Sequence, residues 1–221
     1  MDDPLPSRFA PAGRKPNGIL VVVLAGGRAT RMGGGDKSLL QLGGMSLLEH
    51  VLARLEPQCQ ALAISANGDP ARFSRFGYPV LADSVPGFAG PLAGILSGLD
   101  WAAENQAKAI VTVAADTPFL PHDLVMRLRE AAATKRAAIA LAASPDAAGL
   151  LRRHPTCGLW PVALREPLRA DLVAEFRKAM LWADRHAAAT AVFCKSRVDP
   201  FFNVNTPQDL VQAQALAQLG E

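Results

Sequence analysis

A glycine-rich segment between Leu24 and Ser38 carries the residues best suited to hold a polyphosphate. It reads LAGGRATRMGGGDKS and combines five glycines with Arg28, Arg31 and Lys37. Glycines let the main chain approach a ligand and turn its amide N–H groups inward, so that they form an anion-binding nest. The two arginines and the lysine add positive charge for phosphate oxygens. A surface loop with solvated cations is the simpler alternative, but the position directly after an apolar run favours phosphate binding.

Two familiar phosphate-binding motifs do not fit this segment. A Walker A loop needs G-x-x-x-x-G-K-[ST], whereas Lys37 follows Asp36 rather than glycine. The dinucleotide fingerprint G-x-G-x-x-G also fails, since Gly33 and Gly35 are followed three residues later by Ser38. The segment therefore indicates a phosphate cradle of another type.

A second candidate is Asp116, which stands in VAADTPFLP directly after another apolar run. A carboxylate at the carboxyl end of a sheet strand lies where open α/β folds bind their ligands. Its oxygens suit Mg²⁺, which commonly joins substrate phosphates to one or two carboxylates. The alternative is that Asp116 only caps the turn before Pro118.

Two later motifs carry weaker signals. Asn203 and Asn205 stand in NVNTP, where Thr206 is expected to cap a helix that begins with Pro207. His154 precedes a proline, and a lone histidine there is more often structural than catalytic. No pattern of a Ser/His/Asp or Cys/His nucleophile accompanies the histidines.

Strand and helix patterns alternate along the chain and must position these residues. Ile19–Leu24 and Ala109–Ala115 are continuous apolar runs, typical of strands covered on both faces. Further strands are expected at 61–65, 79–82, 137–143, 154–162 and 189–194, with 137–143 and 154–162 paired as a hairpin. Helices are expected at 46–55 with a capping box, 91–104, 121–133 with Pro121 in its first turn, 164–186 broken by Pro167, and 207–219. This alternation predicts an α/β sandwich with a mostly parallel central sheet.

Length and composition fit one soluble domain. The chain has 221 residues, of which 50% are hydrophobic, and this excludes an intrinsically disordered protein. Residues 1–17, with four prolines and no periodicity, are expected to form a disordered tail before a single domain at 18–221. A net charge of +3 and 6% aromatic residues argue against a nucleic-acid partner. No apolar run is long enough for a membrane span, and three scattered cysteines fit a reducing compartment, so we expect a cytoplasmic protein.

The motifs resemble those of a known family. LAGGRATRMGGGDKSLLQLGG, residues 24–44, is similar to the signature of the molybdenum cofactor guanylyltransferases, within the nucleotidyltransferases of Rossmann-like fold. Relatives that use CTP typically read Ala-Ala-Gly in the first motif and more often Asp-Gln-Pro in the second. This chain has Leu24-Ala25-Gly26-Gly27 and Asp116-Thr117-Pro118, which look like the guanylyltransferase forms. The resemblance implies a Rossmann-like three-layer sandwich of the nucleotide-diphospho-sugar transferase type.

The resemblance also implies a reaction and a set of site residues. The reaction is transfer of GMP from GTP to the terminal phosphate of Mo-molybdopterin, with Mg²⁺ on Asp116 and release of pyrophosphate. Catalytic roles fall on Arg31, Lys37 and Asp116. GTP-binding positions are Leu24, Ala25, Gly26, Gly27, Lys37, Ser65, Asn67, Asp83 and Asp116. The family often carries asparagine at the position of Ser65, so the contact near there falls on either Ser65 or Asn67. The pterin side is assigned to His154, Asn203 and Asn205.

Three alternatives stay open at this level. Two share the chemistry, namely a cytidylyltransferase for the same cofactor and a sugar-phosphate nucleotidyltransferase. The third is a GTP-binding module without transfer activity, against which Asp116 argues, since such modules pair their metal with a Walker loop. Proteins that deliver molybdopterin or mature molybdoenzymes are the protein partners that the resemblance implies.

Overall fold

The computed structural model describes residues 18–26, 36–85, 87, 90–146, 148–194 and 197–218. The expected tail at 1–17 and the predicted site residues Gly27 and Arg31 lie outside this part of the chain. Within it, no helix is long and apolar enough to cross a membrane.

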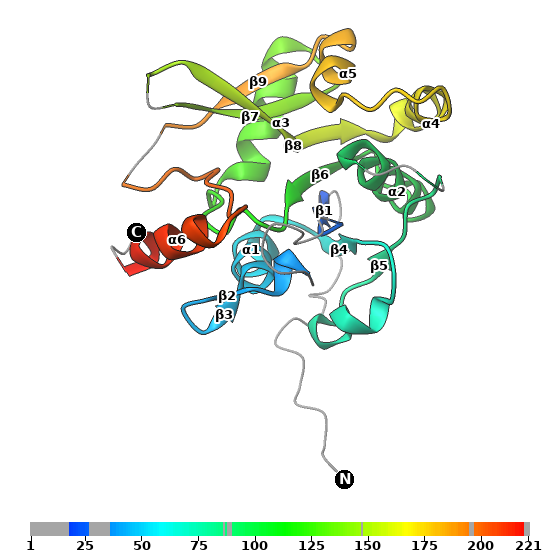
Figure 1. Ribbon diagram of the computed structural model, residues 1–221. Helices are drawn as coiled ribbons and strands as arrows, with labels where there is room; N and C mark the ends of the chain where they lie inside the picture. The colour runs from blue at the N-terminus through cyan, green and yellow to red at the C-terminus, as the bar shows by residue number, and fades with distance from the viewer. Residues whose placement is uncertain are drawn as a thin grey trace.

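A seven-stranded sheet organises the molecule (Figure 1). Its order is β5-β4-β1-β6-β8-β7-β9. The strands are β1 (Leu20–Leu24), β4 (Ala61–Ser65), β5 (Val80–Leu81), β6 (Ala109–Ala114), β7 (Ala140–Pro145), β8 (Leu151–Pro161) and β9 (Ala189–Val192). Only β8 runs antiparallel to its neighbours, β6 and β7, whereas the other pairs are parallel. The predicted α/β fold with a mostly parallel sheet is therefore confirmed, as is the hairpin of β7 and β8.

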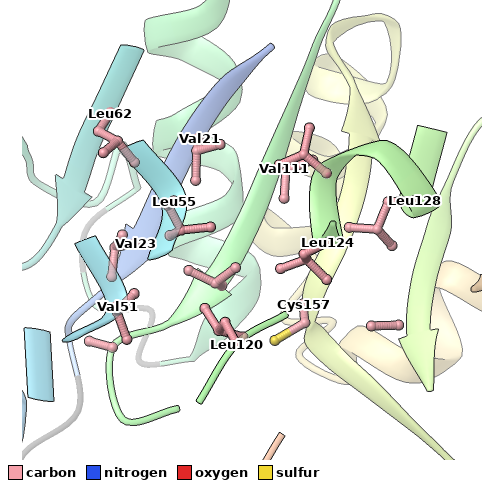
Figure 2. Close-up of a cluster of buried hydrophobic side chains, with 14 of the residues drawn as sticks. Val21, Val23, Val51, Leu55, Leu62, Val111, Leu120, Leu124, Leu128 and Cys157 are labelled. Carbon is pink, nitrogen blue, oxygen red and sulfur yellow. The ribbon is translucent and has the colours of Figure 1, made fainter. Parts of the chain in front are cut away.

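Helices cover both faces of the sheet, which explains why β1 is apolar throughout. Val21 and Val23 face a cluster with α1 (Leu47–Leu55) and α3 (Leu124–Lys135), shown in Figure 2. Leu20 and Val22 face the opposite cluster. That cluster is completed by α2 (Pro91–Glu104), α4 (Arg165–Val173) and α5 (Ala179–Arg185). Because successive side chains of a strand alternate between faces, a strand buried on both sides carries no polar position.

Smaller elements complete the chain. The hairpin of β2 (Gln41–Leu42) and β3 (Met45–Ser46) leads into α1, and α6 (Pro207–Gln218) packs near it through a third apolar cluster. Short 3₁₀ helices lie at η2 (Lys37–Leu39), η3 (Glu56–Gln58), η4 (Pro70–Phe76) and η5 (Val162–Leu164). The predicted capping box of α1 is present, since Ser46 accepts from the Glu49 N–H and Glu49 accepts from the Ser46 N–H.

The prediction that Pro121 lies in the first turn of a helix is wrong. The helix α3 begins three residues later, at Leu124. The Gln58 side chain explains the delay, because it donates to the Pro121 carbonyl at 2.9 Å and accepts from the Val125 N–H at 3.0 Å. A contact 63 residues away in the sequence thus holds residues 121–123 as a turn.

The helix expected at 164–186 is also broken at a different place. Pro167 lies inside the first turn of α4, where a residue without an N–H is tolerated because those amides have no intrahelical acceptor. The break falls between Val173 and Ala179, where Glu175 has φ of 63°. The Trp182 indole N–H then donates to Asp171 at 2.8 Å and ties α5 to α4.

Candidate functional site

The predicted nucleotide contacts gather at one edge of the sheet. Because β1, β4, β5 and β6 are parallel, their carboxyl ends lie side by side. The candidate residues that follow these ends are Ala25, Gly26, Asn67, Asp83 and Asp116. The loops are joined by backbone hydrogen bonds, from the Ala25 N–H to the Ser65 carbonyl and from the Ala115 N–H to the Leu24 carbonyl. This edge is where open α/β sheets bind ligands.

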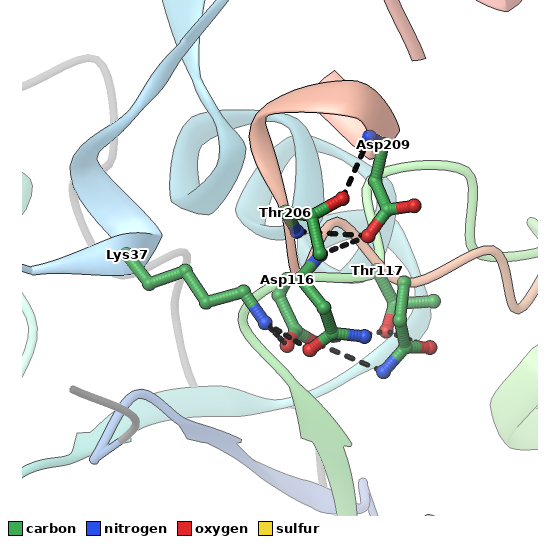
Figure 3. A network of polar contacts seen from close by, with 7 residues as sticks. Lys37, Asp116, Thr117, Thr206 and Asp209 are labelled. Atoms are coloured by element: carbon green, nitrogen blue, oxygen red, sulfur yellow. Dashed lines mark hydrogen bonds and ion pairs between the residues drawn. The ribbon is translucent and has the colours of Figure 1, made fainter. Parts of the chain in front are cut away.

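Asp116 stands at the centre of a polar network (Figure 3). The Lys37 ammonium contacts Asp116 Oδ2 and also donates to Asn205 Oδ1 at 2.5 Å. The Asn203 amide donates to Asp116 Oδ1 at 3.2 Å, and Thr117 is buried beside it. The Lys37 side chain is only 12% exposed and that of Asp116 18% exposed. Lys37 is therefore a partly buried, paired residue, and the interpretation of its segment as a surface loop with solvated cations does not hold for it.

The start of α6 holds the two asparagines in place. The Asp209 carboxylate accepts from the N–H groups of Asn205 and Thr206, each at 2.8 Å, while Thr206 Oγ1 accepts from the Asp209 N–H. The Val204 N–H donates to the Asp116 carbonyl at 3.0 Å. Partial burial raises the pKa of Asp209, but the donated hydrogen bonds outweigh it and the pKa is lowered. The predicted Thr206 cap is confirmed, and the T-x-x-D spacing could have identified Asp209.

Asn67 and Asp83 form a second polar pair at this edge. The Asn67 amide donates to Asp83 Oδ2 at 2.7 Å and accepts from the Asp83 N–H at 2.9 Å. Burial raises the pKa of Asp83, although the Asn67 donor opposes the shift. Ser65 instead lies buried beneath α2, where a Cβ at Gly94 would meet Ser65 Oγ at 2.7 Å. Of the two alternatives, Asn67 is the one whose side chain is exposed at the edge.

Arg72 connects this pair to the region of Lys37. Its guanidinium donates to the Asn67 carbonyl at 2.5 Å and lies 2.9 Å from Asp36 Oδ2. Asp36 directly precedes Lys37, so η4 links the ends of the two candidate binding segments. The sequence carries no local signal for this contact, because Arg72 and Asp36 belong to separate elements.

His154 lies in the part of β8 that pairs with β7. Its ring stacks on Phe201 with centroids 4.4 Å apart, and its Nε2 lies 2.9 Å from Ser144 Oγ. Burial lowers the pKa of His154 to about 4, although the nearby Asp199 carboxylate opposes the shift. The imidazole is therefore neutral at physiological pH.

The stability contribution of His154 is expected to depend on pH. The pKa of His154 falls from the ordinary 6.5 to about 4 on folding. As the pH is lowered from neutral, the imidazole is therefore protonated in the unfolded chain before it is protonated in the folded one. Stability from this group is present above the unfolded pKa and is lost as the pH falls toward the folded one. His154→Phe keeps a ring but cannot be protonated, so it should show a smaller loss between about pH 7 and about pH 5. Urea unfolding of both proteins at each pH measures the loss of unfolding free energy. Equal losses in the two proteins would refute the lowered pKa of His154.

A cavity of about 1020 Å³ lies at the opposite edge of the sheet. The starts of β1, β4 and β6 line it, together with Tyr78, whose hydroxyl donates to Glu56. None of the residues around Asp116 borders this cavity. At the carboxyl edge, the Lys37 ammonium suits phosphate oxygens and the Asp116 carboxylate suits a cation, so we place the candidate site there.

Comparison with known sequences identifies close relatives. Residues 21–192 match the family described as the MobA-like NTP transferase domain. The molybdenum cofactor guanylyltransferase of Mesorhizobium japonicum is 56% identical over 205 residues, which cover 90% of this chain and 96% of the relative. The enzyme of the same name from a strain of Rhodopseudomonas palustris is 53% identical, covering 89% and 91%.

Solved structures share the fold at lower identity. Molybdopterin-guanine dinucleotide biosynthesis protein A from Archaeoglobus fulgidus superposes with a TM-score of 0.70 at 22% identity, covering 91% of this chain and all of that one. A 2-C-methyl-D-erythritol 4-phosphate cytidylyltransferase from Thermus thermophilus gives 0.65 at 21% identity, covering 90% and 98%. The nucleotide-diphospho-sugar transferase fold is therefore common to proteins with different names and substrates, so the fold alone does not identify the family. The relatives of higher sequence identity do. On that evidence the chain belongs to the MobA-like NTP transferase family and, within it, to the molybdenum cofactor guanylyltransferases.

Proposed function

We propose that this protein transfers GMP from GTP to the terminal phosphate of Mo-molybdopterin, forming the guanine dinucleotide cofactor and pyrophosphate. One observation carries the assignment of the site: Lys37 and Asn205, 168 residues apart in the sequence, meet at Asp116 on the carboxyl edge of the sheet. The relatives with this function align over about nine tenths of the chain, which supports the choice of reaction.

The reaction needs positioned charges rather than a covalent enzyme intermediate. An oxygen of the acceptor's terminal phosphate attacks the α-phosphorus of GTP, and the bond to the β-phosphate oxygen breaks. In this proposal Lys37 donates to triphosphate oxygens, and its flexible stem lets the ammonium move from Asp116 to them. The backbone from Leu24 to Gly26, with Asn67 and Asp83, holds the guanosine end. Asn203 and Asn205 bind the acceptor.

Arg31 and Gly27 are further parts of the proposed GTP site. Both belong to the glycine-rich segment, which begins at the end of β1 and closes at Lys37. Arg31 would add a second cation for the phosphates, and Gly27 would let the main chain approach them. Their place in the site rests on the sequence motif.

The residues around Asp116 fit Mg²⁺ held jointly with substrate phosphates. Asp116 offers one carboxylate, whose oxygens are the hard donors that Mg²⁺ prefers. Mg²⁺ commonly joins substrate phosphates to one or two carboxylates, so a single carboxylate suits an ion that is held mainly by phosphates. When bound, Mg²⁺ would offset the negative charge of the phosphates.

GTP should be used in preference to CTP, as the motifs at Leu24–Gly27 and Asp116–Pro118 predict. The test incubates the protein with Mo-molybdopterin, Mg²⁺ and either GTP, CTP, ATP or UTP, and then with GTP and CTP in competition. The nucleotide-linked pterin is identified by mass spectrometry. Equal or faster product formation with CTP would reject the guanine assignment, and no product with any nucleotide would favour a binding module.

The cellular setting is part of the same proposal. The enzyme would act in the cytoplasm, receive Mo-molybdopterin from a delivering protein and pass its product to proteins that mature molybdoenzymes. The free cysteines Cys59, Cys157 and Cys194 support a reducing compartment, and the reaction consumes one form of the cofactor and produces another.

A further inference from the structure

The segment from Asp199 to Thr206 carries both asparagines of the site and is held at its two ends. At the far end, Asp209 and the Asp116 carbonyl bind the backbone N–H groups of residues 204–206. At the near end, the Phe201 ring is buried, 4% exposed, and packs against His154 and Phe193. Asn203 lies between these two anchors, two residues after Phe201.

The near anchor depends on His154. Its ring stacks on Phe201 with an interplanar angle of 20°, and its Nε2 is engaged by Ser144 on the neighbouring strand β7. Ser144 also donates to Asp199 Oδ1 at 3.4 Å, and the same Asp199 oxygen accepts from the Phe201 N–H at 3.0 Å. One ring face and one ring nitrogen of His154 are thus directed at residues that hold the segment.

The orientation of the asparagines follows from this anchoring. A turn begins the segment, since the Phe202 N–H donates to the Asp199 carbonyl at 3.1 Å. Phe201 faces His154 and Phe193, Phe202 faces Phe119, and Asn203 reaches Asp116. A shift of Phe201 would therefore move the Asn203 amide away from the Asp116 carboxylate.

We propose that His154 is a positioning residue, whose ring fixes Phe201 and thereby sets the Asn203 amide against the Asp116 carboxylate. This role rests on the proposed function, because it assumes that the asparagines bind the acceptor. It places His154 behind the site rather than in contact with the pterin.

The test measures backbone hydrogen exchange and transfer kinetics on the full chain. His154→Ala removes both the stacking and the ring nitrogen, His154→Phe restores the stacking alone, and Ser144→Ala removes only the hydroxyl. In His154→Ala, backbone exchange in residues 199–206 should accelerate about tenfold. This factor corresponds to the free energy of one aromatic contact. The KM for Mo-molybdopterin should rise while GTP affinity stays unchanged. His154→Phe should recover most of both effects, and Ser144→Ala should show a smaller effect in the same direction.

His186→Ala is a matched control, because His186 also packs on an aromatic ring, that of Trp182 at 4.2 Å, but on α5. It should leave exchange in residues 199–206 and the KM unchanged. Normal exchange and KM in His154→Ala would overturn the proposal. The proposal would also be overturned if His154→Phe showed normal exchange but the same raised KM as His154→Ala. That result would mean that the imidazole itself contacts the substrate. If the unaltered protein makes no product, the proposed function fails, whereas the exchange result still decides what orders the segment.

Discussion

Asp116→Asn is expected to lower turnover about 10²–10³-fold, the usual loss when one group that stabilises transition-state charge is removed. GTP affinity should fall far less. The carboxylate would hold Mg²⁺ against phosphates whose charge shifts toward the departing pyrophosphate, so the transition state depends on it more than the ground state does. In the free protein, the new amide would still accept from Asn203, but its NH₂ group would face the Lys37 ammonium. Two donors would then meet, and Lys37 would be released to bind phosphate.

The measurement for Asp116→Asn is the initial rate at saturating GTP and Mg²⁺, beside GTP affinity by calorimetry and a thermal melt. Asp123→Asn is the matched control, because Asp123 is an exposed carboxylate paired with Arg127 at the start of α3. It should leave turnover unchanged. Near-normal turnover of the Asp116 variant would exclude Asp116 as the residue that holds Mg²⁺. A much lower melting temperature would support the alternative that Asp116 only shapes the turn before Pro118.

Lys37→Ala should weaken GTP binding by about 1.5–3 kcal/mol, the value of a hydrogen bond to a charged group, which is about tenfold to 150-fold in affinity. The structure adds a cost in stability, because the Lys37 ammonium is paired with Asp116 and its side chain is largely buried. Removing it leaves the carboxylate with Asn203 and Thr117 as its neutral donors. The melting temperature should therefore fall as well.

Lys37→Met separates the two effects, since it keeps an apolar stem of similar length and loses only the charge. Its GTP affinity should match that of Lys37→Ala, and its melting temperature should lie closer to that of the unaltered protein. Lys108→Ala, at an exposed lysine before β6, should change neither quantity. Unchanged calorimetric affinity in both Lys37 variants would exclude Lys37 from the phosphate cradle.

Local patterns in the sequence were enough to predict the fold class and to single out the residues of the proposed site. The apolar run of β1 predicted a strand buried on both faces, and the S-x-x-E and N-x-N-T-P motifs predicted caps that the structure contains. The motifs around Lys37 and Asp116 identified the family. Such features depend on periodicity, glycine and short-range hydrogen bonds, which act over a few residues and can be interpreted without knowing what packs nearby.

Only the tertiary structure decided which residues meet. Gln58 delays the start of α3, Arg72 joins Asp36 to the Asn67 carbonyl, and Lys37 is paired with Asp116 instead of solvated. His154 carried only a weak signal in the sequence, and its contacts with Phe201 and Ser144 became visible once β7, β8 and the segment before α6 were placed together. Each of these contacts joins residues far apart in the sequence or in separate elements. Their partners are set by the order of strands in the sheet and by the packing of its two faces, which no short stretch of sequence encodes.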